Sequence, residues 1–186
     1  MTADTVKSAS ITTLDGTSQQ PPAPTQLTEG IGAVADLENS SDFVFATAGG
    51  LASTGSTYKM VRVPFRTILK DVRLYTKSGL DSSTGLQVDL GAYYSDSIND
   101  GTPAALQGTV ISTNCFVAAQ AFGQSNAGSN IDGLSNLDPN LRNSPLWTQV
   151  GLATDPGGYI DVVLAPHTGA STGIAGNIGV NVSVVN

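Results

Sequence analysis

The pentapeptide Gly169-Ala170-Ser171-Thr172-Gly173 matches the G-x-S-x-G pattern, in which a serine nucleophile lies on a sharp turn. That pattern requires a strand before the turn, a helix after it, and a downstream acid and histidine. Here a strand is predicted after the turn, and the single histidine, His167, precedes Ser171. We therefore interpret the pentapeptide as a turn between the last two strands, and His167 as a residue at a strand end.

Two sets of carboxylates are candidate sites, and the first is in residues 96–101. Residues 96–101 resemble a calcium loop, but EF-hand ligand positions three and twelve hold Ile98 and Gln107. A hairpin loop is the better interpretation, with adventitious calcium at Asp96 and Asp100 left open.

Asp155 and Asp161 flank a turn, as the paired carboxylates of a glycosidase flank the scissile bond. A polysaccharide-cleaving site also offers aromatic platforms, and this chain has one tryptophan. The pair therefore gives no support for a hydrolase.

The composition disfavours catalysis. Only 12 % of the 186 residues are charged, against about 25 % in an average soluble domain. One cysteine excludes a disulfide framework, and one histidine with one cysteine excludes a Cys/His zinc or haem site. Cys115 is interpreted as a small buried hydrophobe. We predict no enzymatic activity, no metal and no cofactor.

No targeting signal is visible, because the chain opens Met-Thr-Ala-Asp-Thr-Val-Lys-Ser without an apolar stretch. No window approaches the roughly 18–20 apolar residues of a membrane span. We expect synthesis in a host cytoplasm and no membrane partner.

Charge is unevenly distributed along the chain. Residues 1–50 contain Lys7 and six acidic residues, whereas six of the eight Lys and Arg residues lie between positions 59 and 77. Those six, the candidate partner-binding residues, are Lys59, Arg62, Arg66, Lys70, Arg73 and Lys77. An acidic chain with one basic segment is a poor nucleic-acid binder, because phosphate contacts dominate that affinity. We predict no nucleic-acid partner.

Residues 1–42 are predicted to form an extended N-terminal arm with little regular structure. They are rich in Thr, Ser and Gln, and Pro21, Pro22 and Pro24 impose a polyproline-like path without internal hydrogen bonds. The arm is either a frayed terminus or a segment ordered by a partner surface. The three prolines are therefore candidate partner-binding residues as well.

Residues 43–186 are predicted to form one antiparallel, jelly-roll-like β-sandwich, so the fold class is all-β. Apolar and polar residues alternate in 86–93 and 177–184, as in strands with one buried face. Further strands are predicted at 58–64, 67–75, 109–113, 147–152 and 159–164. Residues 114–122 are assigned two helical turns, with a short turn at 138–142 and a Gly/Ser/Asn loop at 123–133 between them.

The six clustered cations have two interpretations. They are either solvated residues on two adjacent strands, or a positive strip for an acidic partner surface. In the second case the acidic arm of a neighbouring subunit is a suitable partner, because such complementarity steers assembly and sets register.

Several segments resemble the β-sandwich head decoration, or cement, proteins of tailed bacteriophages. They are 58–64 (YKMVRVP), 69–74 (LKDVRL), 86–93 (LQVDLGAY), 155–162 (DPGGYIDV) and 176–180 (GNIGV). The resemblance covers about residues 55–185 and rests on strand and turn patterns. It implies a jelly-roll-like body on the capsid exterior, an anchoring arm, the major capsid protein as partner, and a homo-oligomer, with a trimer favoured over a dimer. It brings no catalytic residues.

A second hypothesis stays open at this point. A β-sandwich of this kind could serve as a carbohydrate- or receptor-binding module of a phage tail or fibre. Its stacking platforms would be the aromatic residues of the loops and strand ends, namely Tyr93, Tyr94, Trp147 and Tyr159.

Overall fold

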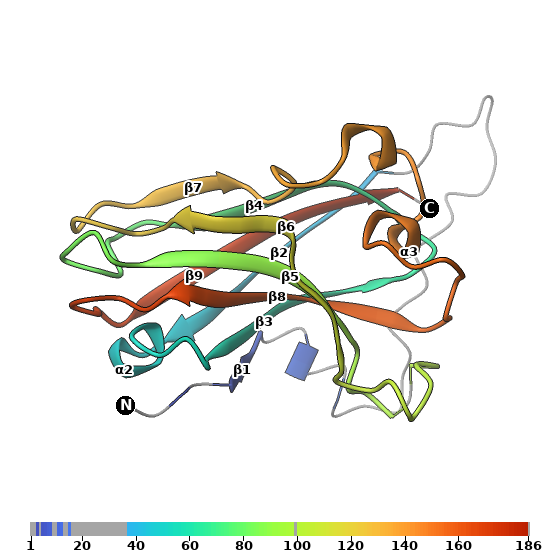
Figure 1. The fold of residues 1–186 in the computed structure, drawn as a ribbon, viewed down its shortest axis with the longest axis horizontal. Coiled ribbons are helices and arrows are strands. Elements are labelled where there is room, and N and C mark those ends of the chain that lie inside the picture. The colour runs from blue at the N-terminus through green and yellow to red at the C-terminus, as the bar shows by residue number, and fades with distance from the viewer. Residues whose placement is uncertain are drawn as a thin grey trace.

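Two β-sheets pack face to face in the computed structural model, which describes residues 3, 5–8, 11, 12, 15, 37–98 and 100–185, and of residues 37–41 the backbone alone (Figure 1). One sheet has the order β1-β3-β8-β5-β6: Thr5–Lys7, Thr57–Pro64, Tyr159–Thr168, Gln87–Tyr94 and Val110–Ala121. The other has the order β2-β9-β4-β7: Leu37–Ala46, Gly176–Val185, Ile68–Thr76 and Ser129–Asp132. All neighbouring strands are antiparallel except β1 and β3. The predicted antiparallel β-sandwich is confirmed, and the jelly-roll connectivity stays a prediction.

Short helical turns lie in the connections between strands: α2 (Ala48–Leu51), the 3-10 turn η1 (Pro139–Leu141) and α3 (Leu146–Gln149). The predicted turn at 138–142 is therefore confirmed as η1, which Asp138 caps by accepting a hydrogen bond from the Asn140 N–H. None of the helices in the described ranges is long and apolar enough to span a membrane.

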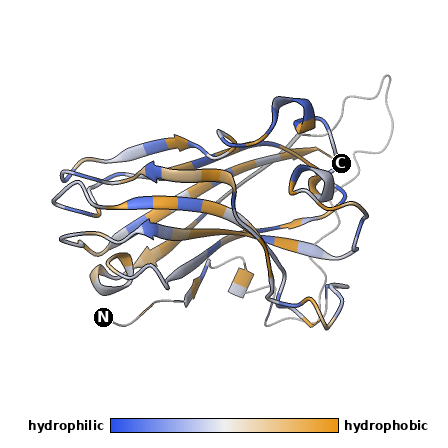
Figure 2. Cartoon of the chain, viewed as in Figure 1, coloured by the Kyte–Doolittle hydropathy of each residue, from blue (hydrophilic) through white to orange (hydrophobic). Residues whose placement is uncertain are grey.

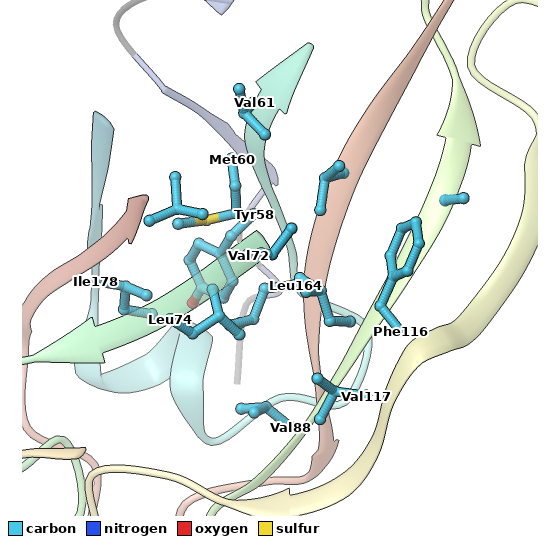
Figure 3. Close-up of a cluster of buried hydrophobic side chains, with 14 of the residues drawn as sticks. Tyr58, Met60, Val61, Val72, Leu74, Val88, Phe116, Val117, Leu164 and Ile178 are labelled. Carbon is cyan, nitrogen blue, oxygen red and sulfur yellow. The ribbon is translucent and has the colours of Figure 1, made fainter. Parts of the chain in front are cut away.

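The hydrophobic core lies between the two sheets. Side chains of both sheets face one another there, with Tyr58, Met60 and Leu164 on one side and Leu74 and Ile178 on the other (Figure 3). The alternation that predicts these faces is visible along β5 in Figure 2. Strands with one apolar face must bury it against another layer, and the two sheets do this for each other.

Three predicted elements are wrong. Strand β7 (Ser129–Asp132), which pairs with β4, lies inside the predicted loop at 123–133. Of the predicted helical residues 114–122, residues 114–121 belong to strand β6 and none is helical. Leu90 pairs with Val117 and Ala92 with Ser112, so residues 113–116 bulge opposite the single residue Gly91. A bulge breaks the period of two, and the remaining apolar spacing imitates a helix.

Residues 147–152, predicted as a strand, form most of α3 and the turn after it. The backbone N–H of Leu146 donates to the Thr67 carbonyl at 2.7 Å, and that of Trp147 donates to the Phe65 carbonyl at 3.1 Å. These bonds hold the start of the helix against the turn between β3 and β4, and long-range contacts of this kind override local propensity.

The N-terminal region contributes to both sheets. β1 lies beside β3, and β2 begins at Leu37 and continues across the predicted arm boundary at residues 42 and 43. A truncation that spares β2 must therefore end at residue 36. The division into arm and domain stays a prediction, and Pro21, Pro22 and Pro24 lie outside the described residues.

Replacing Gly91 with alanine is expected to destabilise the fold by about 3 kcal/mol. A Cβ atom at this position would lie 2.3 Å from the Ser112 carbonyl oxygen and 2.4 Å from backbone atoms of Thr113, so the bulge would have to move. Urea unfolding measures the loss. Gly49→Ala is the matched control, because a Cβ atom there meets nothing within 4 Å, and an equal loss in both variants would contradict the explanation.

Candidate interaction surface

The six candidate cations do not form one strip on adjacent strands. β3 carries Lys59 and Arg62 in the five-stranded sheet, whereas β4 carries Lys70 and Arg73 in the four-stranded sheet. Lys59 and Arg62 are also buried, at 7 % and 8 % exposure. The prediction of a continuous outward strip is therefore wrong, because the chain crosses between the sheets after Pro64.

Lys59 and Arg62 belong instead to a buried ion-pair cluster. The Arg62 guanidinium donates from Nε to Asp161 Oδ1 at 2.7 Å and from a terminal nitrogen to Asp161 Oδ2 at 3.0 Å. Lys59 Nζ lies 2.8 Å from Asp96 and 3.3 Å from Asp161. A bulge between Lys59 and Val61 lets both cations reach the same fully buried Asp161 carboxylate, although strict alternation would place them on opposite faces.

Two residues of the N-terminal region complete this cluster. Lys7 Nζ lies 2.7 Å from Asp96, and Arg62 donates to Asp15 at 2.5 Å. Lys7, Asp15, Lys59, Arg62, Asp96 and Asp161 thus form a cluster of three cations and three carboxylates, and a fourth carboxylate, that of Asp100, lies 4.0 Å from Arg62 Nε. Partial burial alone would raise the pKa of Asp96, but the ammonium groups of Lys59 and Lys7 outweigh it and hold the pKa at about 2. Arm and basic segment, predicted to pair between neighbouring subunits, are joined in this single chain by Asp15 and Arg62, and a contact between subunits stays a prediction.

The other four cations lie closer to solvent. Arg66 pairs with Asp155 at 2.6 Å, Lys70 donates to the Asn143 side chain, and Arg73 pairs with Asp71 on its own strand. Lys77 is exposed just after β4. Exposed pairs of this kind contribute little to stability. Partner binding by Arg66, Lys70, Arg73 and Lys77 stays a prediction.

The carboxylates considered as catalytic or calcium-binding groups form ion pairs with basic side chains of the same chain. Asp155 pairs with Arg66 and Asp161 with Arg62, so each has its own arginine. Asp96 contacts three cations, which disfavours calcium there, and the described residues contain no cluster of three or more His, Cys, Asp and Glu suited to a metal.

The G-x-S-x-G pentapeptide forms the predicted turn between β8 and β9. The backbone N–H of Ser171 donates to Asp81 at 3.2 Å, and strand β9 follows the turn. His167 lies near the end of β8, and its Nδ1 is 2.9 Å from Asp89 Oδ2. Cys115 is half-buried, and burial raises the pKa of its thiol to about 12.

An exposed aromatic face lies on the outer side of the four-stranded sheet. Phe43 on β2 and Tyr75 on β4 both pair with Gly179 on the intervening β9. Phe43, Phe45 and Tyr75 are 56 %, 54 % and 43 % exposed. A Cβ atom at Gly179 would lie 2.3 Å from the Tyr75 ring, so the ring lies across the glycine toward β2. We call Phe43, Phe45 and Tyr75 the aromatic face.

Polar side chains surround the aromatic face. Asn177 pairs with Phe45, Asn130 with Tyr75, and Asn181 with Arg73 one row further along the strands. Rings beside amides and a guanidinium are a composition typical of protein interfaces, where aromatic residues and arginine are enriched.

The aromatic residues expected as stacking platforms are less accessible. Tyr94 is buried at 8 % exposure, and its ring lies 5.5 Å from that of Phe65. Tyr93, Trp147 and Tyr159 are half-buried. None of the four presents an open ring as the aromatic face does.

No protein-family model and no curated protein matches this sequence. The fold is similar to a chain of the cyanophage Pam1 capsid asymmetric unit, with a TM-score of 0.47 and 18 % identity over 89 % of this chain and 99 % of that one.

The aromatic face was not predicted from the sequence, although a signal for it is present. Residues 43–46 read Phe-Val-Phe-Ala, in which Val44 and Ala46 face the core and the two phenylalanines face outward. A strand that is apolar on both faces needs a covering for its outer face, or else exposes apolar surface there.

Proposed function

We propose that this protein is a virion structural protein that binds the outer surface of a phage capsid and stabilises contacts between capsomers, as a decoration or cement protein. Its partners in this proposal are the major capsid protein and further copies of itself, with a trimer favoured. It is made in the host cytoplasm, resides on the capsid exterior and catalyses no reaction. The resemblance of residues 55–185 to phage head decoration proteins supports the proposal.

The aromatic face is the observation that carries the proposal. Its rings lie on a sheet, not in a cleft, and such a surface suits a broad protein partner better than a small ligand. Exposed aromatic rings are the residues that most often dominate binding energy once a partner excludes water from them.

The double variant Phe43→Ser, Phe45→Ser is expected to bind emptied capsids of its own virus at least tenfold more weakly than the wild type. Both side chains are more than half exposed, so the fold does not depend on them. Cosedimentation with capsids measures the affinity. Ile98→Ser is the matched control, because Ile98 is an exposed apolar residue (80 %) on the loop after β5.

Three results are informative. Weaker binding by Phe43→Ser, Phe45→Ser together with wild-type binding by Ile98→Ser supports the proposal. Equal binding by all proteins would remove the aromatic face from the capsid contact. A wild-type protein that does not sediment with capsids would overturn the proposed function.

Carbohydrate or receptor binding by a phage tail or fibre is the alternative function. The specific feature in its favour is the same aromatic face, where Asn177 and Asn181 offer amides beside rings that could stack on a sugar. Specific glycan-array binding that disappears in Phe43→Ser, Phe45→Ser, without capsid cosedimentation, would establish the alternative.

A further inference from the structure

The N-terminal segment, residues 5–15, docks on the outer edge of β3. Of this segment, residues 5–8, 11, 12 and 15 are described. Thr5, Val6 and Lys7 pair in parallel with Thr57, Tyr58 and Lys59, and the Ser8 N–H donates to the Lys59 carbonyl at 2.8 Å. The backbone edge of β3 is therefore one half of a docking site for this segment.

Side chains make the docking specific. Lys7 reaches Asp96, and Asp15 receives the Arg62 guanidinium. Ser8 and Ile11 are completely buried, and Val6 packs against the core. A backbone edge, two ion pairs and buried side chains are the parts of a strand-addition site, in which main-chain bonds give affinity and side chains give register.

We propose that this β3 docking site accepts residues 5–15 of a second copy of the chain when copies are held together, so that neighbouring copies exchange their N-terminal segments. The proposal rests on the proposed function, since a capsid surface brings copies close to one another. Every contact described above is the same whether the segment comes from its own chain or from a neighbour.

Chain length permits the exchange. Residues 16–36 connect the segment to β2 and, fully extended, 21 residues span about 70 Å. The connection is therefore long enough to reach the docking site of an adjacent copy.

Concentration decides which copy supplies the segment. Covalent attachment within one chain gives the chain's own segment an effective concentration on the order of 1 mM. Dilute protein therefore keeps its own segment, whereas copies crowded to similar concentrations exchange it. The charge pattern makes the docking site selective for this segment, because Lys7 meets Asp96 and Asp15 meets Arg62.

Disulfide trapping tests the exchange directly. Thr5 and Thr57 are register partners, and neighbouring strands bring Cα atoms within the range a disulfide needs. One protein carries Thr5→Cys and another carries Thr57→Cys, and the two are mixed at about 0.5 mM, half the expected effective concentration, and oxidised. The native Cys115 is half-buried, and burial raises the pKa of its thiol, which lowers its reactivity in this oxidation.

We expect a covalent dimer of the two variants on non-reducing gels, at a yield that rises with protein concentration. Thr5→Cys mixed with Asn140→Cys is the matched control, because Asn140 is exposed on η1 and belongs to no part of the docking site. The double variant Thr5→Cys, Thr57→Cys is expected to close its disulfide within one chain at micromolar concentration.

A mixture that gives no more dimer than its control, while the double variant closes internally, would overturn the proposal. Failure of the double variant to close at all would overturn it too, because the docking geometry would then be wrong. Capsid cosedimentation of the wild-type protein is independent of both outcomes, so loss of this inference leaves the proposed function standing.

Discussion

Replacing Arg62 with alanine is expected to lower the free energy of unfolding by about 3–5 kcal/mol. The Arg62 side chain is completely buried and donates to three carboxylates, those of Asp161, Asp96 and Asp15. Without it the buried Asp161 carboxylate keeps only Lys59, 3.3 Å away, and an uncompensated buried charge is costly. For a domain of this size such a loss corresponds to a melting temperature lower by roughly 10 °C.

Urea unfolding at neutral pH measures this loss, and two further variants show its cause. Arg73→Ala removes an exposed arginine whose partner, Asp71, is on the same strand, so less than about 1 kcal/mol should be lost. The double variant Arg62→Met, Asp161→Leu removes both members of the buried pair and should recover a large part of the stability. A double variant as unstable as Arg62→Ala would show that the cost comes from lost packing, not from the unpaired charge.

The same variant informs on the N-terminal segment. Arg62 pairs with Asp15, so its loss removes one of the two ion pairs between residues 5–15 and the body of the sandwich. Cross-linking between Thr5→Cys and Thr57→Cys should therefore slow in an Arg62→Ala background. Stability of the body and attachment of the segment are in this way linked through one guanidinium.

The sequence predicts the regular parts of the fold well. Apolar and polar residues alternate along β5 and along most of β9, and buried residues such as Val88 and Val180 lie where the alternation assigns them to the core. Strand β6 is mispredicted as a helix because its pairing is irregular. Ala119 there has a positive φ of 49° and donates its N–H to Asp89, and no local sequence pattern predicts either feature. Local periodicity identifies a strand only where the pairing is regular.

The candidate surface was harder to predict than the fold. Lys59 and Arg62 are three residues apart, and nothing in the sequence marks the bulge that turns both toward Asp161. Asp96 and Asp161, distant in sequence, become their partners only through the sheet order. The sequence shows that the acidic arm and the basic segment carry opposite charges. It does not show that Asp15 contacts Arg62, because that contact depends on the tertiary structure.

Asp81 joins two loops at one end of the sandwich by accepting hydrogen bonds from backbone N–H groups alone. Its Oδ1 accepts from Ser83 and Thr172 and its Oδ2 from Gly85, Leu86 and Ser171, all at 3.0–3.2 Å. The first loop precedes β5, and the second lies between β8 and β9. Burial alone would raise the pKa of this carboxyl, but the N–H donors outweigh it and lower the pKa.

Asp81→Asn is therefore expected to cost about 3–5 kcal/mol at neutral pH, because an amide nitrogen faces N–H donors and the charge that strengthens the bonds is gone. The depressed pKa sets the pH dependence. Its contribution is complete above the unfolded-state value of about 4 and is lost as the pH falls through the lower folded-state value. The difference in unfolding free energy between wild type and variant should accordingly be constant from pH 7 to 5 and shrink below pH 4.

Urea unfolding of both proteins across that pH range measures the difference. Asp138→Asn is the matched control, because Asp138 accepts from the Asn140 N–H on the exposed turn η1, and its loss should cost less than about 1 kcal/mol. A difference for Asp81→Asn that stays unchanged down to pH 2 would show that shape, not charge, holds the two loops together. A cost as small as that of Asp138→Asn would show that the loops are held by their apolar contacts, such as those of the fully buried Leu80 and Leu86.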